Sequence, residues 1–381
     1  MPPLTPTQLI AALLMMILMA SVVAVWAIVF VRILLEQPVL PDSTPRVVPW
    51  GAGSVLGSIL AWFGLQNVTA LLYLIATRPP GGNVPKTSGS PFSPAEQMGL
   101  SAAANVAAVI LIPLLLRASS GARLRDFGIE ARGLARRILE GVLAYPLLAP
   151  CVFGLMLVCV AIWGKSDHPL QQAMMDDRSA GTVALLFFAG SIMAPIAEEL
   201  LFRGVLLGWL TRLAMRPEKR DEPDAASDWT GGLDSDPGPA QGSFLTPISI
   251  EAEDAEGEPF NPYQPPAAPV TADPAPKVAI PSRLILANMA VSAVFALLHG
   301  PQWPAPVPLF VLSMGLGFLY QRTGSLVGPI ALHMTFNGIS TLMLFLAGPM
   351  TPAAPKAPAP IPGPAFHSIE TTPSQIGAVA R

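Results

Sequence analysis

The stretch MAPIAEELLFRGVLLGWL, from Met193 to Leu210, decides how this sequence is interpreted. Glu198, Glu199 and Arg203 lie inside a run that is otherwise apolar enough to cross a lipid bilayer. Removing each charge from water costs on the order of several kcal/mol. Ionisable groups at membrane depth usually face the interior of a helix bundle or a water-filled cavity. We therefore interpret the three residues as a candidate functional site.

The composition of the whole chain indicates a membrane protein. The 381 residues are 52% hydrophobic and only 12% charged, with a mean hydropathy of +0.52. A soluble globular domain carries roughly a quarter charged residues. The formal net charge is -3, and no run of lysine and arginine with interleaved aromatics follows a pattern suited to a phosphate backbone. We expect no nucleic-acid partner.

Charges interrupt the apolar runs, so the candidate spans can be read from the gaps between charges. Five gaps precede the insert, at residues 1–31, 46–78, 96–117, 140–165 and 178–198. Three further apolar pieces follow Arg283, at residues 284–300, 309–321 and 326–348. A transmembrane helix needs about 20 residues, so the piece at 309–321 is short. The sequence predicts an all-α polytopic membrane protein with about eight transmembrane helices.

The pattern of composition also predicts the division of the chain. We expect two N-terminal transmembrane helices with their loops over residues 1–94, and a membrane core over 95–216 and 283–348. The acidic, Pro-rich segment 217–282 holds thirteen of the 25 Asp and Glu residues and few branched aliphatic ones. Such a segment cannot bury enough apolar surface to order itself, so it is predicted to be a disordered insert. The Pro/Ala-rich residues 349–381 are predicted to be a disordered tail.

The distribution of basic residues predicts the orientation. Six arginines lie between residues 117 and 137, and four more basic residues lie between 212 and 220. The opposite loops contain only Arg78, Lys86, Lys165 and Arg178. Since cytoplasmic loops carry an excess of lysine and arginine, the basic loop after the third span is predicted to be cytoplasmic and both termini external.

Three pairs of polar or aromatic residues at helical spacing are the chemical candidates. Glu199 and Arg203 are four residues apart and can form an ion pair on one helix face. FALLHG contains His299 four residues after a phenylalanine, and HMTFNG contains His333 four residues before Asn337. A single buried ion pair or membrane histidine is commonly structural. Candidate residues on three different helices indicate a shared site instead.

These three motifs, EExxxR, FxxxH and HxxxN in this order, closely resemble those of the CAAX-protease and bacteriocin-processing (CPBP, or Abi) family of intramembrane proteases. Its eukaryotic relative is the Ras-converting endopeptidase, which trims prenylated CAAX tails. The resemblance covers roughly residues 117–348, and the long insert between the first two motifs departs from the family pattern. It implies an intramembrane active-site cavity, with catalytic residues Glu198, Glu199, Arg203, His299, His333 and Asn337.

Peptide hydrolysis needs an activated water, stabilisation of the oxyanion and protonation of the leaving amine. We expect Glu198 to act as general base, with Glu199 neutralised by Arg203 and His299 holding the same water. His333 and Asn337 would donate hydrogen bonds to the oxyanion. Alternatively, Glu198, His299 and His333 could bind a divalent metal such as zinc. The HExxH motif that marks many zinc proteases is missing from the sequence, which favours the metal-free mechanism.

Two other functions stay open at the level of sequence. One is a non-catalytic membrane protein, such as an immunity or scaffold protein, and the other is a proton-coupled transporter. No internal inverted repeat supports transport. We expect an integral multi-pass protein of a bacterial plasma membrane, whose partners are the lipid bilayer and a membrane-associated peptide or protein substrate. The identity of the substrate and the oligomeric state do not follow from the sequence.

Overall fold

The computed structural model describes residues 5–40, 45–77, 91–164, 169–215 and 281–346. Over these ranges the protein is entirely helical, without a β-strand. The chain divides into a unit of Met1–Ala214 with Arg283–Arg381, and a second unit of Met215–Ser282. Residues 216–280 and 347–381 lie outside the described ranges, so the predicted disorder of the insert and the tail stays a prediction.

Among the described residues, six helices are long and apolar enough to cross a membrane. They are α1 (Pro6–Leu34), α2 (Ala52–Thr77), α3 (Pro94–Ser120), α4 (Leu134–Trp163), the continuous run Ala180–Ala214 and α11 (Val327–Leu346). The predicted sixth and seventh spans form the helices α9 (Ser282–Leu298, 17 residues) and α10 (Pro306–Thr323, 18 residues). Both are short or polar for independent spans, so the structure supports six of the eight expected membrane helices.

The helix ends follow from local sequence signals. Helix α3 begins with a capping box in which Ser93 and Glu96 satisfy each other's backbone N–H groups, and Pro94 occupies the first turn. It ends at Gly121, whose φ of 70° lies in the left-handed region that glycine adopts without steric cost. The Arg-rich connection to α4 therefore starts at a defined point.

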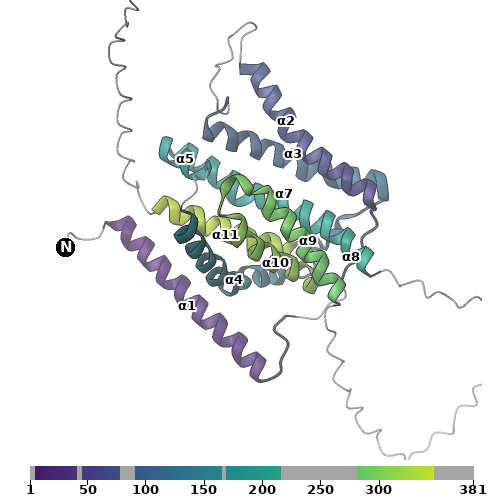
Figure 1. The fold of residues 1–381 in the computed structure, drawn as a ribbon, viewed down its shortest axis with the longest axis horizontal. Coiled ribbons are helices and arrows are strands. Elements are labelled where there is room, and N and C mark those ends of the chain that lie inside the picture. The colour runs from purple at the N-terminus through teal and green to yellow at the C-terminus, as the bar shows by residue number, and fades with distance from the viewer. Residues whose placement is uncertain (1–4, 41–44, 78–90, 165–168, 216–280, 347–381) are drawn as a thin grey trace, which may run out of the picture. The chain divides into compact units, whose positions relative to one another are not determined.

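Helix α11 packs along α4 and α10 in the centre of the bundle (Figure 1). The approach to α4 is close, because a Cβ atom on Gly141 would lie 2.3 Å from the carbonyl oxygen of Gly328. Small residues allow such contacts between membrane helices. Helix α9 is joined to α10 by Asn288, whose Nδ2 donates to the Met314 carbonyl at 2.9 Å. These contacts fix the positions of the helices that carry the second and third motifs.

The turn η1 (Leu124–Phe127), between α3 and α4, is anchored in the protein interior. Phe127 is buried and stacks on Trp50 with 4.7 Å between ring centroids. Trp50 in turn donates its indole N–H to the Val205 carbonyl at 3.0 Å. Leu326 N–H donates to the Phe127 carbonyl at 3.1 Å. The basic turn is thereby held against both the fifth membrane helix and the start of α11.

Candidate active site

The helix that carries the first motif is interrupted by two wider turns. It runs through α6 (Ala180–Phe187), the π-helical η2 (Phe188–Met193), α7 (Ala194–Glu199), the π-helical η3 (Leu200–Leu207) and α8 (Gly208–Ala214). π-Helical turns inside α-helices occur frequently at functional sites. Glu198 and Glu199 are the last residues of the α-helical turn between them.

Asn337 of the third motif binds the first of these wider turns. In a π-helix the carbonyl of Gly190 would accept a bond from the backbone of residue 195, but Pro195 has no N–H to donate. Asn337 Nδ2 donates to the Gly190 carbonyl at 2.9 Å and supplies the missing hydrogen. The side chain thus joins α11 to the fifth membrane helix about two turns before the two glutamates.

Glu199 and Arg203 form a fully buried ion pair. Arg203 Nη1 donates to Glu199 Oε1 at 2.9 Å, and both side chains are 0% exposed. The other terminal nitrogen, Nη2, donates to Ser313 Oγ at 2.7 Å and to the Ser313 carbonyl at 3.3 Å. Glu199 Oε2 and Arg203 Nε have no hydrogen-bond partner among the described residues. The pair is therefore removed from solvent and held by α10.

Aromatic rings enclose the guanidinium group of Arg203. Its carbon lies 4.8 Å from the centroid of Phe295 and 6.0 Å from that of Phe202. The two rings meet edge to face at 5.2 Å. Such cation–π contacts add to the stability of a desolvated arginine. Phe295, the first residue of the second motif, therefore has a packing role.

His333 connects the two glutamates. Its Nδ1 lies 2.8 Å from Glu199 Oε1, and its Nε2 lies 3.8 Å from Glu198 Oε2. A carboxylate bound to one ring nitrogen fixes the tautomer and the orientation of the imidazole. The Glu198 side chain is 18% exposed, whereas those of Glu199 and His333 are 0% and 3% exposed. Glu198 is thus the most accessible member of this cluster.

His299 lies beside the cluster and not within it. Its Nδ1 lies 2.8 Å from the Phe295 carbonyl, and the two rings are 4.8 Å apart. The Phe295 ring is close to both histidines, because its centroid is also 6.0 Å from that of His333. The structure brings Glu198, Glu199, Arg203 and His333 together. His299 contacts Phe295, whose ring is also close to His333, and Asn337 binds Gly190.

The arrangement gives no support to a metal centre. In the described part of the chain, no group of three or more His, Cys, Asp or Glu side chains is placed to hold a metal ion. The alternative set Glu198, His299 and His333 is therefore not arranged to bind a metal ion together. The expected intramembrane cavity is also not established at this site. Two pockets described below are lined by other residues.

Ser313, which is fully buried on α10 and binds Arg203, was not predicted as part of the site. A serine in the apolar run LFVLSMGLGFLYQ was the available signal. Its partner could not be inferred, because the contact joins residues 110 positions apart. It depends on how α10 packs against the fifth membrane helix.

We expect Ser313→Ala to lower the free energy of unfolding by about 1.5–3 kcal/mol, because a buried charged donor loses its hydroxyl acceptor. Ser292→Ala is the matched control: this serine is also fully buried, but its hydroxyl donates at 3.4 Å to the neutral amide of Asn288. Unfolding of both variants in mixed detergent micelles measures the difference. Equal losses in the two variants would show that Ser313 does not stabilise the arginine.

The fold and the cluster define an all-helical, multi-pass integral membrane protein with a buried carboxylate–guanidinium–imidazole site. The family model described as type II CAAX prenyl endopeptidase Rce1-like matches residues 180–221 and 275–339. These ranges contain all three motifs. Over these ranges the chain is similar to the Rce1-like protease family, and this match supports membership of the CAAX-protease (CPBP) family. No curated protein and no solved structure matched the chain in the corresponding comparisons.

Proposed function

We propose that this protein is an intramembrane endopeptidase in which Glu198 activates the water that attacks a peptide bond. The observation that carries the proposal is the order of contacts from Arg203 through Glu199 and His333 to Glu198. The first three groups are buried, and the last is partly accessible. This arrangement gives each group a distinct chemical environment, which is typical of acid–base sites.

Glu199 and Arg203 act as positioning residues in this proposal. The ion pair fixes the Glu199 carboxylate, which accepts a hydrogen bond from His333 Nδ1. His333 Nε2 is then directed toward Glu198 Oε2. The separation of 3.8 Å is too long for a direct hydrogen bond, and one water molecule could contact both atoms.

The proposed hydrolysis needs only the peptide, one water molecule and the side chains of Glu198 and His333. Glu198 takes a proton from the bound water while the oxygen forms a bond to the carbonyl carbon of the substrate. His333 Nε2, when protonated, donates a hydrogen bond to the developing oxyanion. Glu198 then transfers its proton to the amide nitrogen as the carbon–nitrogen bond breaks, which yields a carboxylic acid and an amine.

In this proposal His299 holds the attacking water and Asn337 donates to the oxyanion, as expected from the sequence. The contacts that support the two roles differ. His299 is partly exposed, and its Nδ1 binds the Phe295 carbonyl, so its Nε2 is available to a water or to the leaving group. Asn337 already uses one N–H on Gly190, which supports a positioning role for that residue beside any contact with the oxyanion.

An apolar pocket next to α11 supports a substrate with a hydrocarbon anchor. The pocket measures about 670 Å³ and is lined by residues of α1, α4 and α11, including Ala149. Its wall residue Tyr145 contacts Phe336, with 4.9 Å between ring centroids. Phe336 follows His333 by three residues, so the pocket lies one aromatic layer from the cluster. A prenyl group, as in the CAAX substrates of the matching family, fits this chemistry.

The test is cleavage of a C-terminal CAAX peptide, prenylated or unmodified, by the full-length protein in proteoliposomes. We expect the wild type to cleave the prenylated peptide more efficiently. Ala149→Phe fills the pocket, so it is expected to raise the KM for the prenylated peptide by about tenfold or more at nearly unchanged kcat. The unmodified peptide should be cleaved as by the wild type.

Val158→Phe is the matched control, because Val158 lies on the same helix and is exposed outside the pocket. It should leave both KM values unchanged. No cleavage of either peptide by the wild type would contradict CAAX-type activity. Equal KM changes for both peptides in Ala149→Phe would contradict the hydrocarbon pocket and leave the peptidase itself in place. Full activity after treatment with a chelator would support the metal-free mechanism over the metal-dependent one.

A further inference from the structure

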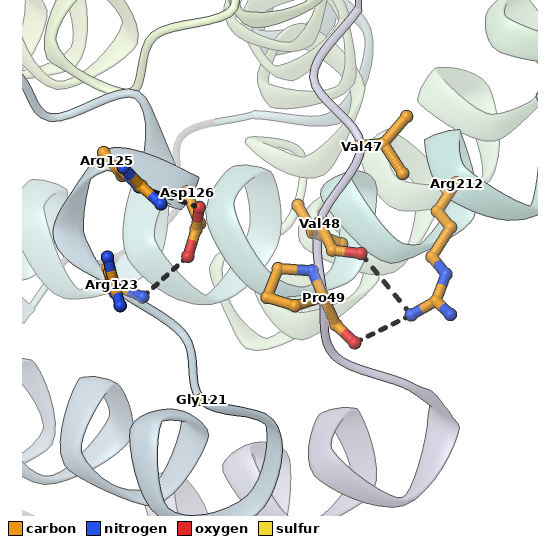
Figure 2. A pocket seen from close by; sticks show the side chains of 8 residues that line it. All are labelled: Val47, Val48, Pro49, Gly121, Arg123, Arg125, Asp126 and Arg212. Atoms are coloured by element: carbon orange, nitrogen blue, oxygen red, sulfur yellow. Dashed lines mark hydrogen bonds and ion pairs between the residues drawn. The ribbon is translucent and has the colours of Figure 1, made fainter. Parts of the chain in front are cut away.

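A second, basic pocket of about 490 Å³ lies away from the candidate active site. Figure 2 shows Arg123, Arg125 and Asp126 of the η1 region on one side of the segment Val47–Pro49 and Arg212 on the other. Gly121, the residue that ends α3, completes the lining. None of these residues takes part in the proposed reaction.

The pocket lies at the ends of several membrane helices. Helix α2 begins just after the segment Val47–Pro49, α3 ends at its base, and Arg212 belongs to the last turn of the run Ala180–Ala214. Helix α4 begins shortly after η1. All four elements start or end on the same side of the bundle, so the pocket lies at one membrane boundary. The excess of arginine predicts that this is the cytoplasmic side.

The charges in the pocket favour an anion. Three arginines against one aspartate leave an excess of two positive charges among the lining residues. Asp126 accepts the backbone N–H of Arg123 at 2.7 Å and lies 4.0 Å from Nε of Arg125. The Arg123 guanidinium makes no hydrogen bond or ion pair within the described ranges. The carboxylate thus offsets the positive charge only in part.

The walls of the pocket are fixed before any ligand binds. Arg212 Nη1 donates to the carbonyls of Pro49 at 2.8 Å and Trp50 at 2.9 Å. Arg46 donates to the carbonyl of Arg125 and pairs with Glu130 at 2.9 Å. Together with the buried Phe127, these contacts hold the backbone of η1 in place. A preformed site loses less conformational entropy when it binds.

We propose that this pocket binds the phosphate group of an anionic phospholipid, with Arg123 and Arg125 as its ligands and Arg212 as part of the wall. The planar guanidinium group presents paired N–H donors that match phosphate oxygens. Basic pockets between membrane helices on the cytoplasmic side suit lipid headgroups, and the location at the membrane boundary favours a lipid over a soluble anion. The inference does not depend on proteolytic activity.

The experiment measures binding of phosphatidylglycerol and phosphatidylcholine to the purified full-length protein by native mass spectrometry from mixed micelles. We expect a preference for phosphatidylglycerol that the double variant Arg123→Gln/Arg125→Gln weakens by about tenfold or more. Both side chains are exposed, so the fold should tolerate the change. Thermal unfolding of the variant checks that it does.

Arg132→Gln/Arg136→Gln is the matched control, because it removes the same charge from the same basic connection at exposed positions outside the pocket. It should change the preference by less than about threefold. Equal weakening in both double variants would overturn the proposal, because the effect would then reflect general surface charge. Binding of inorganic phosphate at the pocket without any preference for phosphatidylglycerol would overturn the lipid as the source of the phosphate.

Discussion

Glu198→Gln is expected to lower the rate of peptide hydrolysis by roughly 10²–10⁴-fold, the range that general acid–base groups contribute. Glutamine keeps the size of the side chain but cannot take a proton from water at neutral pH. Glu198 is partly exposed and, among the described residues, makes only the 3.8 Å approach to His333, so few native contacts are lost. The variant should insert into the membrane and unfold as the wild type does.

The rate is measured with the prenylated peptide in proteoliposomes, in parallel with thermal unfolding in detergent. Glu140→Gln is the matched control, because this glutamate pairs with Arg136 on α4 and is not part of the cluster. It should retain full activity. Wild-type cleavage by a folded Glu198→Gln protein would refute the general-base role. A wild type without hydrolytic activity would favour the non-catalytic or transport alternatives.

The sequence predicted the local part of this site, because that part depends on helical spacing within one segment. The four-residue spacing of Glu199 and Arg203 is sufficient to anticipate their ion pair. The contacts of His333 and Ser313 with this pair depend on the packing of three helices, which the periodicity of a single helix does not define. The sequence alone could also not show that the ring of Phe295 is close to both His299 and His333.

The membrane helices show the same difference between local and tertiary information. Uncharged gaps predicted the six apolar spans, whereas the predicted spans at 284–300 and 309–321 formed α9 and α10, which are short or polar for independent membrane helices. The π-helical turns were not predicted either. Pro195 was visible in the sequence, but the bond from Asn337 to Gly190 joins residues 147 positions apart. Such turns depend on a donor from another helix.

Glu199→Gln is expected to have the largest effect on stability, lowering the free energy of unfolding by about 3–5 kcal/mol. The substitution leaves the guanidinium of Arg203 without its ion-pair partner at a fully buried position. It also removes the charged acceptor from His333 Nδ1. An uncompensated charge inside a protein is costly because its hydration is lost without an opposite charge to replace it.

The double variant Glu199→Gln/Arg203→Met should recover most of this loss. Replacing both charged members of a buried pair by uncharged groups often changes the free energy of unfolding little. Reversible unfolding in mixed micelles of the wild type, both single variants and the double variant gives the coupling energy of the pair. The rescued protein should nevertheless cleave peptide slowly, because a neutral amide orients His333 less firmly than a carboxylate. If the double variant is less stable than Glu199→Gln, the cost arises from lost packing around Arg203 and not from its unpaired charge. Wild-type activity in the double variant would mean that the ion pair supports the fold without positioning His333 for the reaction.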